Sequence, residues 1–430
     1  MSRTDTSTRT STSSKKRRAG RRRGLSFIVI GVAVVGGGLW GMVWWEERPL
    51  RATVRLLEQE DGKGALSSVD RFLRDHPDHG PGIALKARAL VQLGRASEAI
   101  QLFDKAGAAS TEDMRAYTKA CLTLEQWVQA SPVLEYLLRL DPDDADLLHE
   151  VAACRAKLGQ FDEAVEAASR FASIAGNEAR GYLLVGILER DRGNSRKACA
   201  AWARVLQVNP DAKDLQISGD EFHLEYGKAL LKLGEPAAAM DRLKHSIATK
   251  PSSTAISLLG KAYSQLGKTE DAEREWRSAV EGNPSNETAR HGLAELAMNQ
   301  SDFQGALAWL QPLAASPELS SGTAFLLQRV SSLLGDTKSA SDWQIRVEQI
   351  RKLEALHSTV DQVLIDSPSS MWGQVLRSYR LAEQRNWDQA SIMLTPFLEN
   401  PAHPFISELG AAIQDRGPLP HLSGLPIESF

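Results

Sequence analysis

Residues 253–286 read STAISLLGKAYSQLGKTEDAEREWRSAVEGNPSN, and this stretch of 34 residues decides the fold. Apolar residues recur at helical spacing on both sides of Gly267. We expect Gly267 to end the first of two helices, because glycine adopts a left-handed conformation without steric cost. Pro284 closes the stretch, since proline cannot extend the helix before it. The stretch therefore predicts two helices joined by a tight turn.

The same pattern recurs along most of the chain. Alanine occupies the position equivalent to Ala272 ten times, and five of the nine intervals are 34 residues long. We expect two helices to approach closely at this position, where a larger side chain would separate them. The ten positions are Ala65, Ala99, Ala130, Ala164, Ala198, Ala239, Ala272, Ala306, Ala340 and Ala390. Alternating runs of Val, Ile and Thr are absent, so the sequence predicts no sheet.

The period and these residues resemble the tetratricopeptide repeat (TPR), a helix-turn-helix unit. The best match has Leu259, Gly260 and Tyr263 on its first helix and Ala272, Trp276 and Ala279 on its second. The resemblance covers residues 46–404 and implies an all-α, right-handed solenoid of about ten repeats.

The repeat positions also predict how the chain is divided. We expect repeats 1–5 in residues 46–219, repeats 6–9 in 220–370 and a TPR-like tenth repeat in 371–404. Longer intervals predict a surface loop at 211–219 and an extended helix around 345–364 that breaks at 366–368. Residues 405–430 are expected to form a capping helix, at 406–414, and an irregular tail.

The first 45 residues differ from the rest in charge. The chain has 51 basic and 54 acidic residues, a net charge of −3. Residues 1–24 carry nine Lys/Arg against Asp5, and the residues after 45 hold 42 basic and 53 acidic residues, a net of −11. Ten of the first fourteen residues are Ser or Thr, so we expect a disordered tail at 1–24. This tail has no interleaved aromatic residues to stack on bases, and we expect no nucleic-acid partner.

Residues 25–45, from Leu25 to Trp45, contain no charged residue. As a helix these 21 residues span about 31 Å, enough for a hydrocarbon core of about 30 Å. Trp40, Trp44 and Trp45 lie at the C-terminal end of this stretch. Tryptophan rings favour the interface between membrane and water, which is where this end would lie. The stretch therefore predicts an uncleaved transmembrane anchor. A cleaved signal peptide is the alternative, but its apolar region is shorter and ends in an A-x-A-like site.

The charges on the two sides of this span predict its orientation. Eight Lys/Arg lie in the twenty residues before it and four in the twenty after it. The positive-inside rule then puts the tail in the cytoplasm and the body outside it, at a plasma or inner membrane. Ala33, Gly37 and Gly41 are spaced so that two anchors could pack as a homodimer, although glycine is common in membrane helices anyway.

The sequence offers little for catalysis. Three cysteines exclude a disulfide scaffold, and no nucleotide-binding, nucleophile-elbow or zinc-protease motif is present. His76 and His79 could reach one metal ion, but polar residues also suit the closing turn of a repeat. We expect Cys121, Cys154 and Cys199 to be buried as small hydrophobes, and Trp127, Trp202, Trp276 and Trp387 to belong to the core. The sequence therefore indicates no catalytic residue, no metal, no cofactor and no enzyme.

A solenoid offers an extended concave surface instead. The TPR resemblance implies that the first helix of each repeat lines this surface. Ten basic residues fall on it by register: Arg88, Arg115, Lys119, Lys157, Arg180, Arg190, Lys228, Lys232, Lys261 and Arg329. Seven acidic residues fall on the same surface by register: Glu47, Glu112, Asp146, Asp191, Glu221, Glu295 and Glu383. This balance favours an acidic segment of a protein or peptide partner. The alternative is that exposed helix positions are often Lys or Arg.

Together these features predict a membrane-anchored TPR scaffold or adaptor that binds protein partners through its groove. Two other functions stay open. One is a TPR receptor that faces the cytosol, and the other is a regulatory subunit of an envelope enzyme complex, or an undetected hydrolase that uses His76 and His79. The clamp that some TPR proteins use for chaperone C-termini needs asparagine at the ninth position of a repeat, and no repeat here has it.

Overall fold

The computed structural model describes residues 48–316 and 319–426. These residues form 21 α-helices and no strand, which confirms the all-helical class. The predicted tail at 1–24 and the predicted anchor at 25–45 lie outside the described residues. Among the helices that are described, none is both long and apolar enough to cross a membrane.

The chain divides into two compact units, Met1–Ala116 and Tyr117–Phe430. In the first unit, buried Leu57, Val69 and Phe72 belong to one apolar cluster. Its helices are α2 (Arg48–Glu58), α3 (Gly62–Asp75), α4 (Gly80–Gln92), α5 (Ala96–Ala106) and the start of α6 (Thr111–Thr123).

The second unit contains the rest of α6 and sixteen further α-helices among its described residues. They are α7 (Trp127–Leu140), α8 (Ala145–Lys157), α9 (Phe161–Ser173), α10 (Glu178–Asp191), α11 (Ser195–Val208), α12 (Gly219–Leu233), α13 (Pro236–Thr249), α14 (Ser253–Gln265), α15 (Thr269–Gly282), α16 (Glu287–Asn299), α17 (Phe303–Leu310), α18 (Ser321–Leu333), α19 (Thr337–Asp366), α20 (Met371–Glu383), α21 (Trp387–Leu394) and α22 (Pro404–Asp415).

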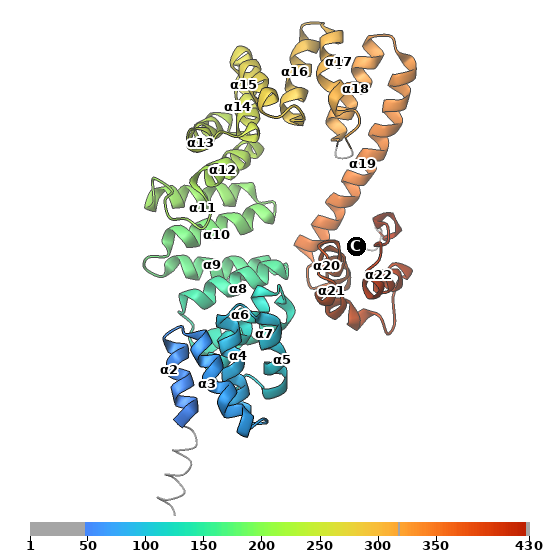
Figure 1. Cartoon of the computed structure of the whole chain (residues 1–430). Coiled ribbons are helices and arrows are strands. Elements are labelled where there is room, and N and C mark those ends of the chain that lie inside the picture. The colour runs from blue at the N-terminus through green and yellow to red at the C-terminus, as the bar shows by residue number, and fades with distance from the viewer. Residues whose placement is uncertain (1–47, 317–318, 427–430) are drawn as a thin grey trace, which may run out of the picture. The chain divides into compact units, whose positions relative to one another are not determined.

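Consecutive helices of the second unit pack as pairs, as Figure 1 shows for α10 with α11 and α12 with α13. The first helix of one pair also contacts the first helix of the next, so that α12, α14, α16 and α18 form one continuous layer. This layer is where a partner-binding face is expected.

The repeated alanine lies where the helices of a pair meet. Nine of the ten alanines have 0% of their surface exposed. The exception is Ala340, which is partly exposed near the start of the long helix α19. At the turns, Gly94, Gly193 and Gly267 have φ of +75°, +82° and +71°, the left-handed region that glycine was expected to supply.

Tryptophan fills the space between neighbouring repeats at two of the four expected positions. Trp202 and Trp276 are buried, whereas Trp127 and Trp387 are only half-buried. Trp276 lies against two glycines: an ideal Cβ at Gly260 would be 2.6 Å from its indole ring, and one at Gly292 would be 2.5 Å away. The ring therefore fits only because both positions lack a side chain.

The irregular intervals correspond to irregular structure. Residues 209–218 connect α11 to α12 as a loop. Helix α19 is 30 residues long and ends at Asp366, at the predicted break. Helix α22 occupies the place of the predicted capping helix. The predicted divisions after residues 219 and 370 stay predictions, and the division into compact units falls after Ala116.

Candidate partner-binding site

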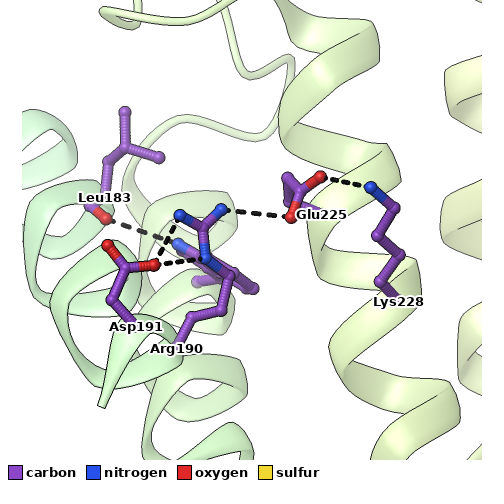
Figure 2. A network of polar contacts seen from close by, with 6 residues as sticks. Leu183, Arg190, Asp191, Glu225 and Lys228 are labelled. Atoms are coloured by element: carbon purple, nitrogen blue, oxygen red, sulfur yellow. Dashed lines mark hydrogen bonds and ion pairs between the residues drawn. The ribbon is translucent and has the colours of Figure 1, made fainter. Parts of the chain in front are cut away.

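Ion pairs connect α10, the first helix of the preceding pair, to α12 of the first-helix layer (Figure 2). The two terminal nitrogens of Arg190 lie 2.7 Å from an Asp191 oxygen and 3.1 Å from a Glu225 oxygen. The other Glu225 oxygen accepts a hydrogen bond of 2.7 Å from Lys228. Because Glu225 joins both basic residues, neither of them offers an uncompensated charge to a partner.

Glu225 is a charged neighbour of the predicted site residues that the sequence did not reveal. Its distance of three residues from Lys228 is a weak sequence signal for an ion pair on one helix. Its pairing with Arg190, 35 residues away, has no such signal. Burial lowers the pKa of Arg190, but the hydrogen bond to Asp191 and the charges of Asp191 and Glu225 outweigh it and leave that pKa above its ordinary value.

Five of the ten predicted basic residues are exposed and, within the described parts of the chain, form no ion pair. They are Lys119, Lys157, Lys232, Lys261 and Arg329. Three of these line cavities on the first-helix layer. Lys232, together with Arg190, lines one of about 1160 Å³, Lys261 one of about 480 Å³ and Arg329 one of about 390 Å³.

The cavities at Lys261 and Arg329 adjoin one another, since Ser264, Trp276, Gly292 and Glu295 line both. A hydrogen bond from His291 lowers the pKa of the Glu295 carboxyl, and the charge of Lys261 adds to this effect. Glu295 is therefore ionised beside Lys261. The first-helix face thus carries separate exposed cations among paired charges, and fewer of its cations are free to meet a partner than the register alone suggests.

The remaining predicted residues have local partners or lie elsewhere. Arg180 stacks over the ring of Phe171, with its guanidinium carbon 5.5 Å from the ring centroid. Arg88 and Arg115 belong to the first unit, where Arg88 lies 3.8 Å from a carboxylate oxygen of Asp113. Arg115 is half-buried. The structure therefore brings Arg190, Lys228 and Lys232 close together but keeps Arg88 and Arg115 in another unit.

The cysteines are poor candidates for chemistry. Cys121, Cys154 and Cys199 are all buried, which confirms their interpretation as small hydrophobes. Burial raises the pKa of the Cys154 thiol to about 12 and that of Cys199 to about 11. Because the thiolate is the reactive form, neither group is a nucleophile at neutral pH.

His76 and His79 have structural contacts at the turn between α3 and α4. The ring of His76 stacks on Phe72 at 4.5 Å, and its Nδ1 lies 3.2 Å from the Phe72 carbonyl oxygen. His79 caps α4, because its Nδ1 accepts a hydrogen bond of 3.1 Å from the Gly82 backbone N–H. No cluster of three or more His, Cys, Asp or Glu suited to a metal ion occurs in residues 48–316 or 319–426.

Two family models match the chain. Residues 47–182 match the model of the Psidin N-terminal TPR repeats region, and residues 257–319 match that of the tetratricopeptide repeat. The helical pairs of these segments are tetratricopeptide repeats. The predicted family is thereby confirmed for these segments.

Similar proteins share modest sequence identity with the chain. It is 22% identical over 264 residues to the N-terminal acetyltransferase A complex auxiliary subunit NAA15 of Arabidopsis thaliana, covering 58% of this chain and 28% of that protein. It is 22% identical over 295 residues to the cellulose synthase 1 operon protein C of Komagataeibacter xylinus, covering 65% and 21%. A solved tetratricopeptide repeat protein from Parabacteroides merdae is 16% identical, with a TM-score of 0.45, covering 56% of this chain and 92% of that one. The chain thus spans about a quarter of the length of NAA15 and of the cellulose synthase 1 operon protein C.

Tetratricopeptide repeats present extended surfaces to protein partners, and residues 47–182 and 257–319 of this chain match models of such repeats. Lys232, Lys261 and Arg329 lie on the first helices of three repeats, in α12, α14 and α18. All three are exposed, line cavities of that layer and have no ion pair within 48–316 and 319–426, although the charge of Glu295 lies near Lys261. This face is the candidate partner-binding site.

Proposed function

We propose that the chain is a membrane-anchored TPR scaffold that binds a protein partner through the exposed cations of its first helices. One observation carries the proposal: Lys232, Lys261 and Arg329 line cavities and have no ion pair within the described residues. An acidic partner segment would complement these charges and gain in association rate and specificity. This role requires no catalytic residue, cofactor or metal, so we propose a binding protein and not an enzyme.

The partner can be identified by crosslinking in intact cells through a photoreactive residue at Ser264, which lines two of the cavities. We then expect Lys232→Glu, Lys261→Glu and Arg329→Glu together to weaken partner binding by at least tenfold, and wild-type binding to weaken as salt is raised. The matched control reverses three exposed cations on second helices or directly after one, Arg196→Glu and Arg204→Glu on α11 and Lys250→Glu after α13. Equal losses in the two triple variants would contradict the proposal.

The membrane part of the proposal rests on residues 25–45 and on the basic tail before them. A topology reporter fused to the C-terminus should be active outside the cytoplasm. Activity in the cytoplasm would instead make the chain a cytosol-facing TPR receptor. Replacing Ala33, Gly37 and Gly41 by leucine should lower crosslinking between two anchors if they pair as a homodimer.

A regulatory subunit of an envelope enzyme complex is the second candidate. The similarity to an auxiliary subunit of an acetyltransferase complex favours it, although the chain spans only 28% of that protein. An enzyme should then co-purify with the chain, and its rate should change when the chain is removed. An enzyme whose rate is unchanged would exclude this candidate.

A further inference from the structure

The cavity at Lys232 has a second wall formed by the same chain. The cavity, of about 1160 Å³, lies between the C-terminal ends of α10 and α12 and the long helix α19. Arg190, Arg192 and Lys232 line it on the side of α10 and α12. Six apolar residues also line it: Phe161, Leu319, Ile350, Leu353, Leu364 and Ile365.

The middle of α19 passes between two separate apolar cores. Val347 belongs to a cluster formed with α16–α18, and Leu356 belongs to a cluster formed with α20–α22. Between them, residues 351–355 are all exposed. Leu353 has 46% of its surface exposed and belongs to neither cluster. The cavity therefore has an apolar side chain in its wall that nothing in the described chain covers.

The residues of α19 at this cavity form a stripe. Ile350, Leu353, His357 and Leu364 line it at intervals of three, four and seven residues. Residues at this spacing share one face of a helix and form the kind of ridge on which a second helix packs. A helix also satisfies its own backbone hydrogen bonds, so it can cover an apolar wall without leaving buried N–H groups unpaired.

The side of α10 and α12 supplies a single uncommitted charge. Arg190 is held by Asp191 and Glu225, and Arg192 pairs with Asp162. Lys232 is exposed, with no ion pair among the residues that the structure describes. On α19 an occupant meets the apolar stripe and, beside it, the carboxylates of Glu354 and Asp361, of which Asp361 is paired with Arg380. On α12 it meets the exposed ammonium group of Lys232.

We propose that this cavity receives a short amphipathic helix from a partner protein, with its apolar face on α19 and a carboxylate beside Lys232. This inference rests on the scaffold function proposed above and specifies the kind of segment that is bound.

The experiment uses the full-length chain in intact cells, with a photoreactive residue at Leu353 as the probe. We expect it to crosslink to a partner segment with apolar residues at i, i+3 or i+4 and i+7 and with Asp or Glu on the other face. Binding of this partner is then measured for two variants of the same helix. Leu353→Glu should weaken it at least tenfold, since a leucine contact is lost and a carboxylate is desolvated.

The control variant is Ile345→Glu, because Ile345 is 57% exposed on α19 and does not line the cavity. It should leave partner binding unchanged. Equal effects of the two variants would overturn the inference. So would crosslinks from position 353 to α10 or α12 of the same chain, to a second copy or to lipid. Binding that is lost in Lys261→Glu and Arg329→Glu but kept in Leu353→Glu would refute this site and leave the scaffold function standing. Binding kept in all three variants would refute both.

Discussion

Two packing contacts of the second unit can be compared: α14 with α16 around Trp276, and α20–α21 with α7–α9. Around Trp276 the contact is apolar and closely fitted. The indole is 3% exposed, its N–H donates a hydrogen bond of 3.0 Å to the Ser257 carbonyl, and Gly260 and Gly292 leave room for the ring. Every polar atom of the indole is thus paired, and the rest of the ring packs against two backbones.

The contact of α20–α21 with α7–α9 is made by polar groups. The side-chain amide of Gln389 donates a hydrogen bond of 2.8 Å to Gln129 and accepts one of 3.3 Å from the Val128 N–H. Arg377 of α20 is 7% exposed, and its Nη2 lies so close to Gly159 that a Cβ there would be 1.5 Å away. Its Nε and Nη1 have no hydrogen-bond partner in the described chain. Burial lowers the pKa of this guanidinium to about 10.

The difference indicates which contact can separate. The buried apolar cluster of α20–α22 draws on α19 and the C-terminal residues and on none from α7–α9. Separating these parts would expose amides that water can satisfy and would relieve an unpaired buried charge. Separating α14 from α16 would expose the indole and open a cavity. The contact between α14 and α16 in the repeat stack is therefore expected to stay closed. The contact of α20–α21 with α7–α9, the C-terminal contact, is the one expected to open.

Removing the indole should have the largest effect. Trp276→Ala should lower the free energy of unfolding by about 3–5 kcal/mol, because it removes apolar contacts and leaves a cavity. The midpoint of chemical denaturation, followed by circular dichroism, measures this. A loss below about 1 kcal/mol would show that the repeat stack does not depend on this ring.

Lowering the pH should reduce the free energy of unfolding, because His223 is buried in its uncharged form. Burial, with the charges of Arg242 and His245 added, lowers the pKa of His223 from 6.5 to about 4. Between these values the unfolded chain binds a proton that the folded chain does not, so stability is present above pH 6.5 and falls as the pH drops toward 4. The loss reaches about 3 kcal/mol at 1.36 kcal/mol per unit. His223→Leu should flatten the dependence of the denaturation midpoint on pH, and an unchanged slope would contradict this assignment.

Substituting two glycines should change stability less than Trp276→Ala does. The two substitutions add the same methyl group, so each serves as a control for the other. Gly292→Ala should cost about 1–3 kcal/mol, because its new Cβ would overlap the Trp276 ring. Gly322→Ala introduces the same methyl group on α18, where the nearest atom is 3.7 Å away. It should be neutral or stabilise the helix by up to about 1 kcal/mol. Comparing the two denaturation midpoints tests the fit at Trp276, and equal costs would show that the ring adapts.

The smallest change in stability is expected at the C-terminal contact, between α20–α21 and α7–α9. Here the substitution should stabilise the protein, whereas the substitutions at Trp276 and Gly292 should destabilise it. Arg377→Met removes an unpaired buried charge and should stabilise the contact by about 1 kcal/mol. Hydrogen exchange should then slow about fivefold in α20 and in the turn between α8 and α9. The control is Arg380→Met, since Arg380 is paired with Asp361 and Glu383 and its loss should not slow exchange. Faster exchange in Arg377→Met would mean that the guanidinium holds the contact together.

The helices, the turns and most close contacts within a repeat could be predicted from the sequence. These features depend on residues fewer than 34 positions apart, and their spacing is the spacing of one repeat. Ala272 and Gly267, for example, lie at the positions that the pattern requires. Ala340 departs from the pattern, since it is partly exposed, and it lies on α19, which at 30 residues is longer than the other second helices.

Contacts between distant repeats could not be predicted. The pairing of Arg190 with Glu225 joins two repeats, and that of Gln389 with Gln129 spans 260 residues. Both pairings depend on small rotations between successive repeats, which accumulate along the array. The sequence pattern within one repeat does not encode the size of these rotations. The same holds for the cavity at Lys232, whose second wall comes from α19.

Helix α19 also has a mechanical consequence. Its 30 residues give a rod of about 45 Å that spans the distance between two cores. About 29 Å of it lies beyond Val347, so a rotation of about 10° at that residue would move the far end by about 5 Å, since a helix of this length bends little. The rod therefore acts as a lever arm that would turn a small adjustment at Val347 into a displacement larger than any hydrogen bond between Gln389 and Gln129 could follow.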